Sequence, residues 1–350
     1  MSLNASVRDV TFFAALCLAL SAIEFMVPKP LPFMRLGLAN LPLILALFKF
    51  SSKDFFFLVL LKILCQAFIS GTFFSYIFIF SFFSTFASSI TMFFLHKFFS
   101  QKISCIGLSI SGSLANNFVQ IIFSKFFLFK DGIRYISPLL LTSGFITGIA
   151  LGIFANIFVK KSQWFDYFIN NKSFPTKNIQ TEPISHNSEK KINLYLLFFV
   201  SLIVMLWFVL QKNVKIISVA TVIFFIILYI KNIIKKKKPP QILPPFFLLL
   251  TVVACSLLQP FGKVLFQIGT FSITSGALFA GIRRGCIVIG TVFLSKIAIS
   301  DNLKIPGKIG TLLTQIFNDF EKLSSIKKAV KTQTFFSDLD SQLLHTYLNN

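Results

Sequence analysis

Long apolar runs constrain the fold of this chain more than any other feature. Runs of about 17–25 residues recur along it, and an α-helix needs about 20 residues to cross a hydrocarbon core of ~30 Å. In lipid, only helices and closed barrels satisfy all of their own backbone hydrogen bonds. The runs are continuous rather than alternating, so they predict helices and not barrel strands. The spans lie near 10–27, 36–50, 55–70, 74–95, 104–125, 138–160, 193–211, 214–230, 244–260 and 274–297.

A polar segment divides these spans into two sets. Residues 162–191 are rich in Asn, Ser, Pro and Lys and poor in apolar side chains, which is typical of a linker. We therefore expect an all-α, polytopic transmembrane protein with about ten spans in two helical domains. The predicted divisions are a six-span domain over 1–161, the linker over 162–191, a four-span domain over 192–300 and a cytoplasmic tail over 301–350.

The charge of the chain fits a membrane partner rather than nucleic acid. Lys and Arg number 34 against 12 Asp and Glu, a formal net charge of +22. In a soluble protein this excess would indicate nucleic-acid binding. Here the basic residues lie between apolar runs, where the positive-inside rule places them. We expect a lipid bilayer and no nucleic acid as partner, in the cell (cytoplasmic or inner) membrane, with both termini cytoplasmic.

Sequence signatures of catalysis and of cofactor binding are absent. The chain has no phosphate-binding G-x-x-x-x-G-K-[ST], no H-E-x-x-H and no G-x-S-x-G. Asp338 and Asp340 do not form an aspartate-rich Mg²⁺-diphosphate motif. The five cysteines lie within apolar runs without a C-x-x-C spacing, and the three histidines are scattered. The sequence predicts a protein that is not an enzyme and has no cofactor or metal.

Polar side chains in or beside the predicted spans of the first half are the candidates for binding a ligand. They are costly at membrane depth, so each needs a partner or a ligand. Either they bind a polar or anionic small molecule in a pocket between helices, or they pair and hold the helices together. Residues four apart, such as 62 with 66 and 116 with 120, share a helix face. The candidates are Glu24, Arg35, Asn40, Lys62, Gln66, Asn116, Asn117 and Gln120.

The second predicted span is interrupted near its start. It begins R-L-G-L-A-N-L-P, which places Gly37, Asn40 and Pro42 within a few residues. Irregular backbone at membrane depth is tolerated where it is buried in protein or lines a cavity. The segment either lines a cavity or is a re-entrant packing element.

Small residues form smooth faces on two predicted helices. Ala15, Ala19 and Ala22 are spaced four and three apart on the first span. Glycines 144, 148 and 152 form a similar ridge on the sixth. Such faces let helices approach closely in lipid. Each ridge docks either within this protein or against a partner.

Several motifs of the first half, in order, resemble a known family. They are ALSAIEFMVPKPLPFMRLGLANLPLILAL, the region 62–71, SISGSLANNFVQ and ISPLLLTSGFITGIALG, covering roughly residues 8–160. The segment resembles the Gx transporter family, which is also described as heptaprenyl diphosphate synthase component I.

That resemblance implies the fold of a substrate-binding (S) component of energy-coupling factor (ECF) transporters, with six helices around one small-molecule pocket. It implies that Ala15 and Ala19 dock the first helix on the transmembrane T component. Lys62 stands where the family is expected to carry Arg, which keeps the positive charge. The resemblance assigns the pocket to Glu24, Arg35, Asn40, Asn116 and Gln120.

The second half resembles part of a T component over about residues 193–325, most clearly between Gln259 and Leu313. T components continue with two cytoplasmic coupling helices that bear Ala-Arg-Gly motifs. Here Arg283-Arg284-Gly285 lies at the start of the last predicted span instead. The resemblance implies either a reduced coupling function or coupling by another chain.

These observations favour a membrane transport protein that takes up a vitamin-like or precursor small molecule. Separate ATPase subunits would energise it, since the chain has no nucleotide motif. One alternative is a non-catalytic membrane subunit associated with polyprenyl (heptaprenyl) diphosphate synthesis. Another is a membrane scaffold of a flavin or redox complex.

Overall fold

The computed structural model describes most of the chain, and this part is almost entirely helical. The described residues are 3–26, 37–73, 75–99, 102–170, 194–234, 239–240, 242–268, 271–298, 308–325, 340–341, 343–344 and 346–347. Within them, the β structure is a short antiparallel hairpin of β1 (Val264–Ile268) and β2 (Phe271–Thr274). The predicted all-α fold class is confirmed.

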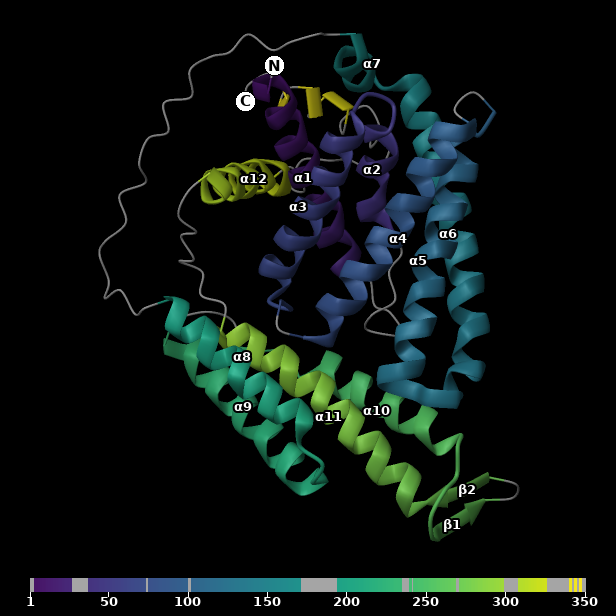
Figure 1. Ribbon diagram of the computed structural model, residues 1–350, viewed down its shortest axis with the longest axis vertical. Helices are drawn as coiled ribbons and strands as arrows, with labels where there is room; N and C mark the ends of the chain where they lie inside the picture. Colours follow the sequence, from purple (N-terminus) through teal and green to yellow (C-terminus); the bar gives the residue numbers. More distant parts are fainter. Residues whose placement is uncertain are drawn as a thin grey trace.

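The first half forms a compact helical unit. In Figure 1, α4, α5 and α6 stand side by side, with α5 between its two neighbours, and α1 packs on α3. The short helix α2 contacts α1, α3, α5 and α6, so the interrupted second span lies inside the unit. The elements are α1 (Leu3–Met26), η1 (Leu38–Asn40), α2 (Leu41–Ala46), α3 (Ser52–Ser70), α4 (Tyr76–Phe99), α5 (Cys105–Ser124), η2 (Lys125–Phe129), η3 (Lys130–Gly132), α6 (Ile133–Lys161) and α7 (Gln163–Asn170).

The second half is built around one helix. Helix α11 (Ser275–Ala298) packs on α8 (Leu194–Leu210), α9 (Val214–Ile234) and α10 (Leu243–Leu257), and it also contacts α4 and η2 of the first half. Figure 1 shows these helices running obliquely beneath the upright α4–α6. The amphipathic helix α12 (Lys308–Ser325) follows and crosses α1.

Five described helices are long and apolar enough to cross a membrane. They are α4, α5 with η2, α6, α9 and α11. Two segments are apolar but shorter: residues 200–210 of α8, and α10. Helices α1 and α3 are long, but ionisable side chains interrupt them, among them Glu24 and Lys62. The chain is a helical membrane protein, and the count of ten spans stays a prediction.

The glycine ridge of α6 packs inside the protein, against α5. A Cβ atom at Gly148 would lie 2.5 Å from the Ser113 hydroxyl oxygen and 3.0 Å from the Ile110 Cα. At Gly152 it would lie 2.5 Å from the Ile106 Cα. Because these contacts include backbone atoms, the ridge sets the distance between α5 and α6.

The start of the predicted linker is instead a buried helix. Residues 163–170 form α7, whose Trp164, Phe165 and Phe168 are buried. Asp340, far along the chain, caps this helix by accepting hydrogen bonds from the Ser162 hydroxyl and from the backbone N–H of residue 163, the latter at 2.8 Å. Residues 171–191, the rest of the predicted linker, lie outside the described part of the chain.

Candidate functional site

A buried lysine lies at the centre of the first candidate site. Helix α3 begins after Ser51, whose hydroxyl accepts a hydrogen bond from the Asp54 N–H at 3.3 Å. Lys62 lies three turns further on and is only 2% exposed. Its ammonium group donates to the Asn40 side-chain oxygen at 2.5 Å. The structure therefore joins two predicted site residues, one on a long helix and one on the interrupted segment.

Local backbone geometry explains why Asn40 reaches this position. Gly37 has a φ of 87°, a left-handed conformation that favours glycine. It directly precedes η1, a 3₁₀ helix of one turn. Pro42 then occupies the first turn of α2, where a missing N–H is tolerated. The turn therefore brings the Asn40 amide to α3.

One turn further along α3, a second predicted residue binds α1. The Gln66 amide donates to the Ser21 hydroxyl at 2.6 Å, and both side chains are buried. Glu24 lies three residues after Ser21, hence on the same side of α1, and it is 5% exposed. We call Ser21, Glu24, Asn40, Lys62 and Gln66 the Lys62 cluster. Arg35, the remaining predicted residue of this region, lies outside the described residues.

The Lys62 cluster can hold an anionic group. A charged side chain away from water is costly unless it is paired and hydrogen-bonded. Asn40 supplies a hydrogen-bond acceptor to the Lys62 ammonium group. Amide and hydroxyl groups on α1, η1 and α3 and the Glu24 carboxylate complete the cluster, so Lys62 is its one group that attracts a carboxylate or phosphate.

The three predicted site residues on α5 differ in their hydrogen bonding. The Asn117 amide donates to the Leu140 carbonyl of α6 at 2.5 Å, so this side chain links two helices. Asn116 donates to the Asn117 side chain at 3.3 Å. Gln120 is 1% exposed, and its side-chain oxygen has no hydrogen-bond partner among the described residues. Among the described residues, Asn117 is the one of these three side chains that bonds to α6, as expected of an interhelical link.

The alanine face of α1 is covered by the protein itself. Ala15 is fully buried, and Ala19 packs against the same core. At 100° per residue this face points away from Glu24, and α1 packs on both α3 and α12. Ala22 is half-buried. Leu313 and Ile316 of α12 belong to the core cluster that contains Ala15.

A polar contact ties the C-terminal tail to the start of α1. The Tyr347 hydroxyl donates to the Asp9 carboxylate at 2.9 Å, and its ring lies against Phe12 and Trp164. Burial raises the pKa of Asp9 above its ordinary value of 3.8, although Tyr347, Lys49 and Arg8 act to lower it. Nothing in the sequence pattern predicted this contact.

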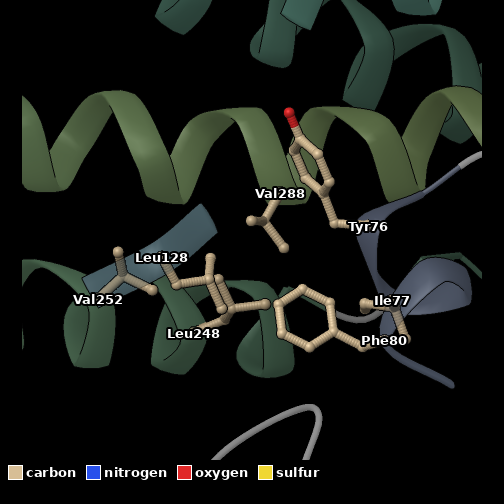
Figure 2. Close-up of a pocket in the computed structure, with 7 residues that line it drawn as sticks. All are labelled: Tyr76, Ile77, Phe80, Leu128, Leu248, Val252 and Val288. Atoms are coloured by element: carbon tan, nitrogen blue, oxygen red, sulfur yellow. The ribbon is translucent and has the colours of Figure 1, made fainter. Parts of the chain in front are cut away.

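An apolar crevice lies where the two halves meet. Figure 2 shows Phe80 of α4 and Leu248 of α10 approaching each other, with Val288 of α11 above them. Its lining is Tyr76, Ile77, Phe80, Leu128, Leu248, Val252 and Val288. Beside it, the Arg284 guanidinium donates to the Leu128 carbonyl at 3.2 Å. No charged side chain lines the crevice, so it offers no charged partner to a polar substrate. It marks the contact between the two halves.

A protein-family model matches most of the first half of the chain. Residues 13–158 match the family described as heptaprenyl diphosphate synthase component I. This matched region covers α2 to α5, most of α1 and α6, and every described residue of the Lys62 cluster. The family description names one component of a synthase, which implies further subunits in proteins of that family. Residues 194–300 match a domain of unknown function (DUF8519). No curated protein and no solved structure matches the chain.

Proposed function

We propose that this protein is the substrate-binding membrane component of an ECF-type uptake system for a small anionic molecule of the vitamin or precursor type. The observation that carries this proposal is Lys62, almost fully buried in α3 and hydrogen-bonded to Asn40 of an interrupted membrane segment. A buried cation beside broken helix geometry is typical of substrate sites at membrane depth.

The arrangement of the two halves supports a transport role. In this proposal α12, from the T-like half, occupies the alanine face that the S-component resemblance assigns to docking. Its apolar Leu313, Ile316 and Leu323 are buried, and its opposite face is polar. Separate ATPase subunits would supply the energy, since the chain has no nucleotide-binding motif.

A charge substitution at Lys62 tests the binding site. We expect a small anionic compound to be released when full-length wild-type protein, purified in nanodiscs, is denatured and analysed by mass spectrometry. Lys62→Gln removes the buried charge and should lower the amount recovered at least tenfold, because a hydrogen bond to a charged group contributes about 1.5–3 kcal/mol. Lys53→Gln is the matched control, since Lys53 is exposed on the same helix. Equal recovery from wild type and Lys62→Gln would contradict the site.

A second candidate function follows from the family description. In this alternative, the protein is a non-catalytic membrane subunit that supports heptaprenyl diphosphate synthesis. A prenyl diphosphate is also anionic, so the Lys62 cluster fits either function chemically. The two proposals differ in the partner: nucleotide-hydrolysing subunits for transport, and a prenyl diphosphate synthase for the alternative.

A further inference from the structure

Helix α4 carries a stripe of hydroxyl groups that faces the interior of the first half. At 100° per residue its members lie on one side of the helix. On one flank of the stripe, Phe86 stacks on Phe56 of α3 and Phe93 lies tilted against the same ring. On the other flank, Phe80 and Phe83 pack on Phe123 of α5. All five members are buried, at 7% exposure or less: Ser81, Ser84, Thr85, Ser88 and Ser89.

Helix α5 brings a second polar row to the same place. Gly112 lets Ser88 and Met92 come close, because a Cβ there would lie 3.1 Å from the Ser88 hydroxyl oxygen and 2.7 Å from the Met92 sulfur. Asn116 and Gln120 follow Gly112 at intervals of four, hence on the same face of α5. The two helices are antiparallel neighbours, so these rows form one seam, which we call the α4–α5 seam.

Several polar atoms of this seam and its ends lack a hydrogen bond. Among the described residues, the hydroxyl oxygens of Ser88, Ser89 and Ser124 and the side-chain oxygen of Gln120 have no partner. Their side chains are 0%, 0%, 0% and 1% exposed. A helical hydroxyl can donate to the carbonyl one turn back, as Thr91 does to Ala87 at 2.9 Å. A buried polar group left unpaired costs about 1–3 kcal/mol, so four together point to a missing binding partner.

We infer that the α4–α5 seam is a binding site for neutral hydroxyl groups, supplied by ordered water or by the hydroxylated body of the bound solute. Hydroxyl groups both donate and accept, so they match serine hydroxyls and an amide oxygen together. The seam residues carry no charge, and their hydroxyl and amide groups match the donors and acceptors of a neutral hydroxyl group. Where the hydroxyls belong to the substrate, the inference rests on the proposed function and adds α4 to a site that otherwise includes α1, η1, α3 and α5.

Hydroxyl-radical footprinting of the full-length protein in nanodiscs tests this site. Met92 lies beside Ser88 and is 1% exposed, so only radicals formed from water inside the seam reach it readily. The variant Ser88→Ala with Gln120→Leu removes two unpaired polar groups. Thr91→Val is the control, because its hydroxyl is already bonded within α4. Small molecules released on denaturation are analysed by mass spectrometry in parallel.

Two results support the site and identify its source of hydroxyls. If water supplies the hydroxyl groups, Met92 is oxidised in wild type and in Thr91→Val, and its oxidation falls about fivefold or more in the double variant. If a bound solute supplies them, Met92 is protected from oxidation in wild type, and a hydroxylated compound released from wild type is lost from the double variant. The inference is overturned if Met92 oxidation and the released compounds are the same in wild type and the double variant. Lys62→Gln should leave Met92 oxidation by water unchanged, so failure at Lys62 and failure at the seam are separable.

Discussion

Individual ionisable side chains determine where this protein can bind a ligand other than lipid. Lys62 would be costly in a membrane helix without partners, and the structure gives it Asn40. The sequence indicated this chemistry, because a lysine inside an apolar run is conspicuous. It did not indicate the α4 serines, since small neutral hydroxyls hardly change hydropathy and their burial depends on neighbouring helices.

Asp9 predicts a pH dependence of stability. Burial raises its pKa in the folded protein above 3.8, so the folded state holds the proton more tightly than the unfolded state does. This contribution to stability is complete below pH 3.8 and is lost as the pH rises through the folded-state pKa. We expect the thermal midpoint of wild type to fall relative to that of Asp9→Asn over this interval. A difference between the two proteins that stays constant with pH would contradict the assignment.

Helix packing in the first half depends on small residues as much as on apolar ones. The sequence predicted α4, α5, α6, α9 and α11 well, because long apolar runs carry their own signal. It left open whether the glycines of α6 face a partner. The structure places them against α5, with Asn117 bonding to the Leu140 carbonyl beside them. Helix α7 was missed, because its partners Asp340 and Tyr347 are about 180 residues away in sequence and no local pattern reveals them.

Enlarging the α6 ridge should separate α5 from α6. Gly148→Leu places a side chain where even a Cβ is 3.0 Å from the Ile110 Cα. Overpacking of this kind costs about 1–3 kcal/mol, so thermal unfolding in nanodiscs should shift down by several degrees. Ile146→Leu, at a position 65% exposed on the same helix, is the control and should leave unfolding unchanged. An unchanged midpoint in Gly148→Leu would show that the ridge is not tightly packed.

At the scale of the whole molecule, the two helical units differ in direction. Figure 1 shows α9 and α11 slanting beneath the upright α4–α6, although both sets are long and apolar enough to span a bilayer. Spanning helices tilt by about 20° on average, with a range of about 0–40°. The two sets therefore cannot both run along the membrane normal, so at least one of them is tilted. The polar outer face of α12, which lies across α1, indicates that this flank of the first half meets water.

Cysteine labelling tests the orientation of that flank. Asn318 is exposed on α12, whereas Ile146 is exposed on the apolar surface of α6. In nanodiscs, Asn318→Cys should react with a water-soluble maleimide at least tenfold faster than Ile146→Cys. The five native cysteines are buried and should give little background. Equal rates at both positions would contradict the proposed surroundings of α12.

The partners of the full-length chain test the transport proposal most directly. The measurement is affinity capture from native membranes in mild detergent, with quantitative mass spectrometry of the proteins recovered. Wild-type protein is compared with Ala15→Leu/Ala19→Leu, which should displace α12 and weaken the assembly. Transport predicts that nucleotide-hydrolysing subunits are recovered in near-stoichiometric amounts with wild type and in reduced amounts with the variant. Stoichiometric recovery of a prenyl diphosphate synthase without any nucleotide-hydrolysing subunit would contradict it.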